Sequence, residues 1–372
     1  MVAMAVAMGI GRFVFTPILP GMMDALGLSV GEAGLIASAN YAGYLVGAVL
    51  AAGGWAAGHE RRIALASLAA TALLLAAMGL TGSMAPFLAI RFLAGVASAF
   101  VMIFLTTILF ARFSVLGRDD LQSWHFGGVG LGIAVSSVLI GILLTAGAAW
   151  QAGWLWSGVI SLAGLALVAV LVDAEPAAAR RPPPEPPVPA SPALTRIVLA
   201  YGLFGFGYIV TATFLVAIVR EGEAGRMFEA AVWFATGLAG LPSVWLWAKV
   251  VRRLGLAATF AIGCAVEAVG VVASVAAGGY AGPLIGGALL GGTFIAVTAM
   301  GLQLGRMLAG AAPRRVLAWM TAAFGLGQIF GPIAAAYLAA RTGSFLAPSL
   351  MAAAMLAAAA VIGFSARPPA RT

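Results

Sequence analysis

The feature that most constrains this chain is a series of apolar runs, separated by short breaks that are charged or rich in proline and glycine. A helix needs about 20 apolar residues to cross the ~30 Å hydrocarbon core of a bilayer. Since no water inside that core can bond to exposed backbone groups, a run of this kind is expected to be helical. The breaks delimit twelve such runs, at residues 1–23, 30–57, 62–82, 84–111, 123–147, 150–172, 194–219, 227–248, 256–277, 282–305, 313–340 and 344–366.

Composition excludes the main alternatives to a polytopic membrane protein. Hydrophobic residues make up 63% of the chain and charged residues 9%, whereas a soluble domain has roughly 25% charged residues. The net charge of +8 is typical of basic membrane loops, so we expect no nucleic-acid partner. One cysteine, Cys264, cannot form an intrachain disulfide, and His59 and His125 lie far apart in sequence. We therefore expect no metal site and no cofactor.

Basic residues fall almost entirely on one side of the predicted spans. If the N-terminus is cytoplasmic, three basic residues in the connecting segments, Arg220, Arg226 and Arg341, lie outside. The positive-inside rule then predicts a protein of the bacterial inner membrane with both termini in the cytoplasm. The first run lacks the basic start of a cleavable signal, so we read it as the first span and expect a few cytoplasmic residues upstream. The fifteen on the inside are Arg61, Arg62, Arg112, Arg118, Arg180, Arg181, Arg196, Lys249, Arg252, Arg253, Arg306, Arg314, Arg315, Arg367 and Arg371.

The chain divides into two similar halves. Residues 173–193 contain eight prolines and cannot remain helical, which predicts a cytoplasmic linker between six-helix bundles at 1–172 and 194–372. "GIGRFVFTPIL" in the first span aligns with "GFGYIVTATFL" in the seventh, and this alignment puts Tyr208 at the position of Arg12. "FGGVGLGIA" in the fifth span similarly aligns with "FGLGQIFGP" in the eleventh. Two parallel repeats of six helices are typical of secondary transporters.

These elements resemble the major facilitator superfamily over essentially the whole chain. "RFLAG", which begins at Arg91, resembles the family's intramembrane arginine motif, and "GWAAGHERR" resembles its cytoplasmic gate motif. The gate motif normally has Asp where this chain has Gly58. "GRFxxTPxLP" with "GFGYIxxxTFL" is similar to the YbfB/YjiJ-type branch. The resemblance implies an all-α fold of twelve transmembrane helices, usually monomeric. It also implies alternating access around a cavity lined by the first, fourth, seventh and tenth helices.

Arg12 is the most informative single residue, because it is a charge in the middle of the first apolar run. Such a charge is expensive in lipid and therefore faces protein or a wet cavity. Gly9 and Gly11 before it and Pro17 after it favour a bend. Two hypotheses stay open: Arg12 binds an anionic substrate group, or it bonds to carbonyls that the bend frees. Tyr208 would offer a hydroxyl and a ring to the same ligand, or pack in the core.

Arg91 is a second arginine well inside a predicted span, and it cannot itself release a proton because a guanidinium group stays charged in proteins. The resemblance suggests a role in proton coupling or gating, or in holding a substrate charge, for Arg91. It also assigns Arg61 and Arg62 to the gate motif. The alternative for Arg91 is a structural arginine bonded to backbone carbonyls.

Glu267 is the acid that lies well inside a predicted span. Desolvation favours its neutral form, which makes it a candidate proton carrier or a hydrogen-bonded packing residue. Polar residues elsewhere in the spans either line the pathway or hold helices together, and helical spacing does not separate the two roles. We count Asn40, Tyr44 and Thr293 among the candidate substrate-binding residues.

No set of catalytic groups and no phosphate-binding loop is found in the sequence, so we expect neither an enzyme nor direct ATP drive. The leading hypothesis is a secondary active transporter, coupled to protons, for a small organic anion. Efflux of drugs or hydrophobic compounds is the alternative within the same class. A transporter-like receptor or scaffold that moves nothing is the alternative from another class, motivated by the altered gate motif.

Overall fold

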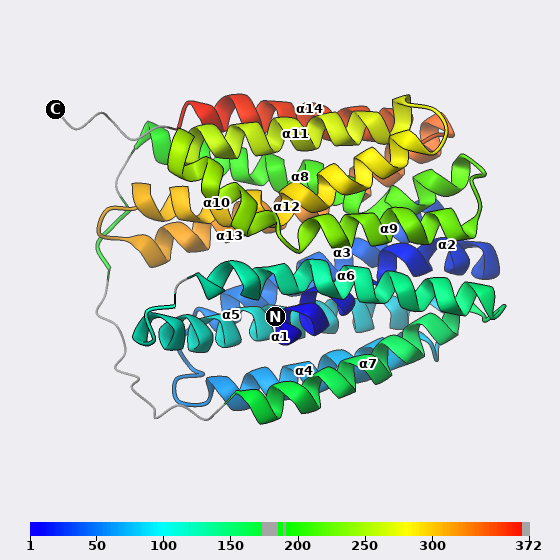
Figure 1. The fold of residues 1–372 in the computed structure, drawn as a ribbon, viewed down its shortest axis with the longest axis horizontal. Helices are drawn as coiled ribbons and strands as arrows, with labels where there is room; N and C mark the ends of the chain where they lie inside the picture. The colour runs from blue at the N-terminus through cyan, green and yellow to red at the C-terminus, as the bar shows by residue number, and fades with distance from the viewer. Residues whose placement is uncertain (119, 173–184, 189–190, 367–372) are drawn as a thin grey trace.

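The computed structural model describes residues 1–118, 120–172, 185–188 and 191–366, and every regular element in these ranges is a helix. Figure 1 shows the helices running roughly parallel along one axis. Their bounds are α1 Val2–Met4, the π-helix η1 Ala5–Ile10, α2 Phe15–Leu26, α3 Val30–Ala51, α4 Glu60–Met78, α5 Met84–Val115, α6 Leu121–Thr145, α7 Trp150–Leu171, α8 Pro192–Glu221, α9 Arg226–Gly240, α10 Ser243–Leu254, α11 Leu256–Ala276, α12 Ala281–Leu308, α13 Pro313–Thr342 and α14 Leu346–Phe364.

The twelve predicted spans are matched by helices of sufficient length and apolar character. Eleven helices qualify as single spans, and the pair α9 and α10 makes a twelfth that is bent by 47° near Pro242. Several predicted boundaries are wrong: the second span ends at Ala51 rather than at 57, the third ends at Met78 rather than at 82, and α10 continues to Leu254 rather than ending at 248. The predicted linker is also two residues too long, because helix α8 already begins at Pro192. Most of the predicted linker, 173–184 and 189–190, lies outside the described residues.

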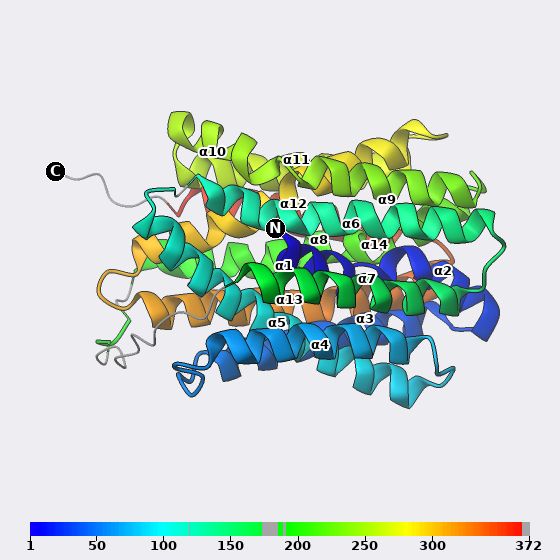
Figure 2. The same ribbon diagram turned by 60° about the horizontal axis from the view of Figure 1, so that its bottom comes forward.

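In Figure 1 the helices α8 to α14 form one side of the molecule and α4 to α7 form the other. Figure 2 shows the same ribbon turned by 60°, where helices of the two groups overlap in projection. The ends of α5, α10 and α12 and the starts of α4 and α13 gather at one end, on the left in Figure 1. We call this the basic end, because those helix ends carry Arg61, Arg112, Arg252, Arg306 and Arg314. The opposite end, where α2 and α8 finish, is called the far end.

The first span is interrupted halfway along its length. Its π-helix η1 gives way to a turn at residues 11–14 before α2 begins. The amide of Gly11 donates to Val6 O, five residues back, and the amide of Thr16 donates to Phe13 O, three residues back. Pro17 has no amide proton to give. The regular ladder is therefore broken around Arg12, which leaves carbonyls there that need donors from elsewhere in the protein.

Glycines allow helix backbones to touch at equivalent places in both halves. A Cβ atom on Gly95 of α5 would overlap the carbonyl oxygen of Asn40 in α3. A Cβ atom on Gly291 of α12 would likewise overlap the carbonyl oxygen of Thr236 in α9. Small residues at such crossings permit close helix packing inside a membrane. These contacts fix α3 against α5, and α9 against α12, with almost no freedom to slide.

The neighbouring glycines 291 and 292 provide a matched test of this packing. Gly291→Ala is expected to destabilise the protein by about 1–3 kcal/mol, because the added methyl group meets the backbone of Thr236. Gly292→Ala meets nothing within 4 Å and is expected to be neutral or to stabilise by up to about 1 kcal/mol. Unfolding of both variants in detergent measures the difference. Equal stability of the two would show that the α9 and α12 backbones are not in tight contact.

Candidate functional site

A cavity of about 70 Å³ lies in the interior, where the first span meets helices of the second half. Arg12 is the only charged side chain among the described residues that line it. The rest of the lining is apolar or aromatic, apart from Tyr44, Tyr208 and Thr298. The lining residues are Met4, Met8, Arg12, Phe13, Tyr44, Met102, Phe126, Val129, Tyr208, Phe294, Ile295, Thr298, Ala299, Leu302 and Phe324.

Arg12 is 2% exposed, and its guanidinium group is held mainly by aromatic rings. Its Cζ atom lies 4.7 Å from the ring centroid of Tyr41 and 4.5 Å from that of Tyr44. Its Nη2 donates to Oε1 of Gln328 at 2.8 Å. Its Nε has no hydrogen-bond partner, and no carboxylate pairs with Arg12 in the part of the chain that the structure describes. The positive charge is thus stabilised by π faces and an amide but is not neutralised.

Gln328 joins the first half to the second. Its side chain comes from α13, accepts from Arg12 and donates through Nε2 to the hydroxyl of Tyr208 in α8. All three side chains are buried. The predicted repeat partners Arg12 and Tyr208 therefore do meet at one site, with Gln328 between them.

Arg91 makes the contacts that the alternative hypothesis assigned to a structural arginine. Its Nη1 donates to Gly11 O at 3.4 Å and its Nη2 to Arg12 O at 3.3 Å, the carbonyls beside the break in the first span. Its Cζ lies 4.9 Å from the ring centroid of Phe15. Arg91 is 1% exposed and is not among the described residues that line the cavity. It supports the backbone of Arg12 from outside the cavity.

Of the other candidate binding residues, one lines the cavity and two lie in helix interfaces. Tyr44 lines the cavity, whereas Asn40 donates through Nδ2 to Arg91 O at 3.0 Å in the α3–α5 interface. Thr293 Oγ1 lies 3.0 Å from Oε2 of Glu267, so these two form a buried pair between α11 and α12. Neither Asn40 nor Thr293 is among the described lining residues.

The gate-motif residues lie at the basic end, away from the cavity. Arg61 donates to the carbonyls of Val172 and, at 2.8 Å, Ala169, and so holds the end of α7. Arg62 is exposed. Gly58, where the motif usually has Asp, has φ 78°. An L-residue rarely adopts this left-handed conformation, which gives a conformational reason for glycine at this position.

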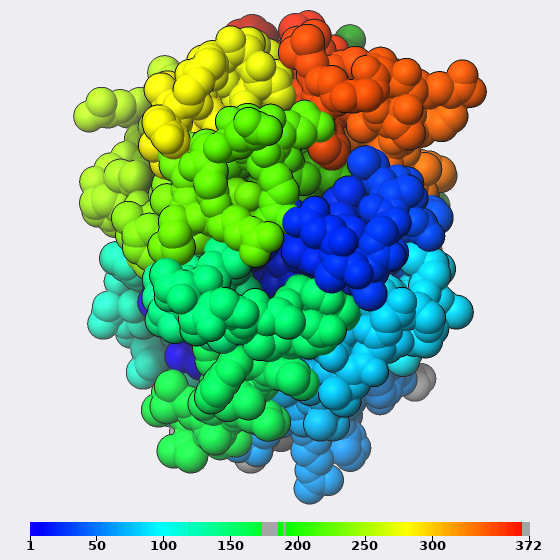
Figure 3. Space-filling view, turned by 90° about the vertical axis from the view of Figure 1, so that its right-hand side faces the viewer, coloured from blue at the N-terminus to red at the C-terminus, as the bar shows by residue number. Residues whose placement is uncertain are grey.

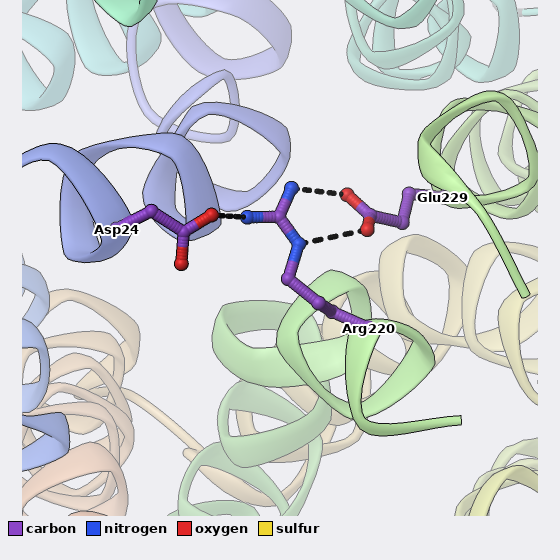
Figure 4. A network of polar contacts seen from close by, with 3 residues as sticks. All are labelled: Asp24, Arg220 and Glu229. Atoms are coloured by element: carbon purple, nitrogen blue, oxygen red, sulfur yellow. Dashed lines mark hydrogen bonds and ion pairs between the residues drawn. The ribbon is translucent and has the colours of Figure 1, made fainter. Parts of the chain in front are cut away.

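Three charged residues link the two halves at the far end (Figure 4). Arg220 of α8 pairs with Glu229 of α9 through two bonds of 2.8 and 2.7 Å, and its Nη1 donates to Oδ2 of Asp24 in α2 at 2.6 Å. Figure 3 shows the end of α2 packed against the start of α9 on this face. Glu229 is 4% exposed. The contact with Asp24 crosses between the halves, whereas the contact with Glu229 stays within one. We call these three residues the far-end triad.

Comparison with known proteins decides the family. A family model described as "Uncharacterised MFS-type transporter YbfB" matches residues 4–364. The chain belongs to this family of major facilitator superfamily transporters. Its membership agrees with the resemblance seen in the sequence and assigns the chain to transporters rather than to enzymes. A search of curated proteins finds no match.

Solved structures confirm the transporter fold. The crystal structure of the nucleoside transporter NupG, as a D323A mutant, is 13% identical, with a TM-score of 0.75 and 98% of each chain covered. The crystal structure of a bacterial homologue of the human lysosomal transporter Spinster, in an inward-facing and unoccupied conformation, is 12% identical. Its TM-score is 0.68, with 98% of this chain and 95% of that chain covered. At such identities the likeness concerns the fold.

For this MFS transporter, Arg91→Met tests the supporting role of Arg91. Without the guanidinium group, Gly11 O and Arg12 O lose their donors inside the membrane, which should destabilise the protein by about 2 kcal/mol or more. Unfolding in detergent measures the loss. Arg341→Met, an arginine stacked at 5.1 Å on Tyr337 near the far end, is the control and should change little. Unchanged stability of the Arg91→Met protein would contradict the supporting role.

Asp24→Asn tests the far-end triad in the same transporter. The substitution removes the ion pair between Asp24 and Arg220, which joins the two halves, and leaves the Arg220–Glu229 pair unaltered. It should therefore favour opening at the far end. The measurement is thiol labelling of an Ala212→Cys reporter, a position 3% exposed in α8, in a Cys264→Ala background. A pair of this exposure is worth up to about 1 kcal/mol, so labelling should accelerate up to about fivefold.

Asp120→Asn is the matched control for this experiment, since Asp120 pairs with Arg118 within one half at the basic end. It should leave the labelling rate unchanged. Equal acceleration by both variants, or by neither, would show that the Asp24 contact does not hold the far end closed.

Proposed function

We propose that this protein is a proton-coupled secondary active transporter that moves a small organic anion through the central cavity by alternating access. The basic end faces the cytoplasm of a bacterium, together with both termini, and the working unit is a monomer. The family assignment supports a transporter in general, and the site supports the finer parts of the proposal.

The observation that supports an anionic substrate is the uncompensated charge of Arg12. A buried cation normally has a carboxylate partner, because an unpaired charge in a low-dielectric interior is costly. Among the described residues Arg12 has an amide and ring faces in place of one, and the cavity lining contains no acid. An anionic substrate would supply the missing negative charge. A cationic drug would meet repulsion at the same place, which disfavours the efflux alternative for cations.

The contacts that cross between the two halves support alternating access. At the far end the charged crossing contact is Arg220 with Asp24, and at the cavity Arg12 bonds to Gln328. Neutral hydrogen bonds also cross between the halves, among them Thr16 Oγ1 to Ala212 O and Ser137 Oγ to Ala230 O. In this proposal residues 1–172 and 194–372 move as two units, and the far-end triad closes one entrance while substrate exchanges at the other. Substrate replaces the Arg12–Gln328 contact during the cycle.

Glu267 is the proposed proton carrier, on the evidence of its partner. A threonine hydroxyl has one proton to donate, and Thr293 Oγ1 donates it to Leu289 O, 2.6 Å away. The contact between Thr293 Oγ1 and Glu267 is then best satisfied when the carboxyl group is protonated and donates. Glu267 is fully buried, and its Oε1 has no partner among the described residues. Thr293 is adjacent to Phe294, a lining residue, so loss of this proton would be transmitted to α12 beside the cavity.

Flux measurements in reconstituted vesicles test the proposal. With a pH gradient imposed, a panel of labelled organic anions should include substrates that accumulate in vesicles with the wild-type protein. Arg12→Gln should reduce their flux at least about tenfold, which corresponds to loss of one charged hydrogen bond. Glu267→Gln, which cannot release a proton, should abolish accumulation while exchange of unlabelled for labelled substrate continues. Glu223→Gln, an exposed acid near the far end, is the control and should behave as wild type.

The outcomes separate the alternatives. Accumulation of lipophilic cations with no anion flux would support drug efflux instead. Binding without any flux would support a receptor or scaffold. Retained accumulation by the Glu267→Gln protein would assign the proton to another group.

A further inference from the structure

We infer that the substrate is a small, flat monocarboxylate: an organic acid with one carboxylate and a planar, apolar body about the size of one aromatic ring. This inference rests on the proposed function, because it names the class of anion that the Arg12 cavity accepts. It depends on the two parallel donors, Nε and Nη2, of the Arg12 guanidinium group, on the aromatic rings that line the cavity and on the volume of the cavity.

The donors that Arg12 presents match a carboxylate better than they match their present partner. Nε and Nη2 lie on the same edge of a guanidinium group and point in parallel. In this structure Nη2 is bonded to Oε1 of Gln328, and Nε has no partner among the described residues although it is buried. An amide has one oxygen and satisfies one of the two donors. A carboxylate has two oxygens and satisfies both in the bidentate arrangement that arginine favours.

Gln328 therefore occupies the position that the substrate's carboxylate would take. Its amide oxygen lies on Arg12 and its amide nitrogen on the Tyr208 hydroxyl. A carboxylate that takes Nε and Nη2 displaces this oxygen, since a charge-assisted bond is stronger than the neutral one it replaces. When Gln328 is displaced, the contact between α13 and the first span is exchanged for a contact with substrate.

A single negative charge fits the site, and a second would have no partner. Arg12 is the sole cation among the described lining residues. The guanidinium of Arg91 is directed to the carbonyls of Gly11 and Arg12 instead. A dicarboxylate or a phosphate dianion would bring excess charge into an apolar cavity, where desolvation is expensive.

The walls of the cavity favour a planar apolar body. The ring of Tyr208 stacks on Phe294, with centroids 5.8 Å apart and planes at 11°, and on Phe324, at 5.6 Å and 13°. Phe13 meets Phe294 edge to face at 5.7 Å. All four rings line the cavity, so a planar apolar ligand would meet aromatic surface there. A polyhydroxylated ligand would find few partners for its hydroxyl groups, since Tyr44, Tyr208 and Thr298 are the uncharged polar residues of the described lining.

The volume of the cavity limits the size of the substrate. It measures about 70 Å³, whereas sites for drug-sized ligands have about 300–1,000 Å³. With the far end closed by Asp24 and Arg220, the site encloses a ligand of about one ring.

The test uses benzoate as the probe on the purified full-length protein, with binding measured by calorimetry and by thermal stabilisation. Benzyl alcohol and benzylamine keep the ring without the negative charge, acetate keeps the carboxylate without the ring, and terephthalate adds a second charge. Cyclohexanecarboxylate keeps the charge and the size but not the planar face. Benzoate is expected to bind at least about tenfold more tightly than each of these. Tighter binding of acetate, cyclohexanecarboxylate or terephthalate than of benzoate would overturn the inference.

Variants test the geometry independently of the ligand series. Arg12→Gln should weaken benzoate binding at least about tenfold, and Arg12→Lys should restore only part of it because lysine lacks the two-donor edge. Gln328→Leu removes the competing amide and should tighten benzoate binding. Arg341→Gln, remote from the cavity, is the control and should bind as wild type. If Gln328→Leu weakens binding instead, the amide helps to hold the substrate, and the inference that Gln328 occupies the carboxylate's position is wrong.

The same experiments distinguish failure of this inference from failure of the proposed function. If succinate or phosphate binds more tightly than benzoate, loses affinity in Arg12→Gln and is transported in vesicles, the anion transporter stands and the monocarboxylate inference falls. If no anion binds or is transported while each variant remains folded and monodisperse, both fall.

Discussion

Inside a bilayer each backbone carbonyl must find a donor within the protein, and the break in the first span leaves this requirement to a distant side chain. Arg91 supplies donors to Gly11 O and Arg12 O. Because these bonds support the irregular backbone, the side chain of Arg12 can leave its own helix and reach Gln328 in the second half. The position of Arg12 in the cavity lining and its contact with Gln328 both depend on that support.

The two intramembrane arginines thus divide two tasks that are indistinguishable in the sequence. Each is buried, each lies beside aromatic rings, and each was open to either a substrate role or a structural one. The difference is in the acceptors: Arg91 has backbone carbonyls, and Arg12 has a side-chain amide that another acceptor can replace. The Nε of each arginine is buried without a partner among the described residues, so the kind of acceptor bound by the other nitrogens, rather than burial, separates support from a candidate binding role.

Hydrophobicity and local chemistry make a large part of the fold predictable from the sequence. Apolar run length predicts the spans, the glycines and prolines around Arg12 predict an irregular first helix, and the aligned motifs predict that Arg12 and Tyr208 lie near each other. The sequence does not predict Gln328 as their connector, since this residue is 316 positions from Arg12 and many polar residues in the spans look alike. The far-end triad is missed for the same reason: Asp24, Arg220 and Glu229 lie at helix ends, where charges are ordinary. Their pairing depends on how the two halves pack.

In the proposed alternating-access cycle, the composition of that triad affects how much free energy is needed to open the far end. Arg220 keeps the buried Glu229 whether or not α2 is near, so separation of the halves leaves no isolated buried charge and returns one half-exposed carboxylate, Asp24, to water. A contact of that kind shifts a conformational equilibrium by only about fivefold. In the proposed alternating-access cycle, this charged contact alone therefore does not lock the far end, and a ligand shifts the two conformations in proportion to its difference in affinity for them. A fully buried inter-half ion pair would cost more to separate, because each charge would be left buried without its partner.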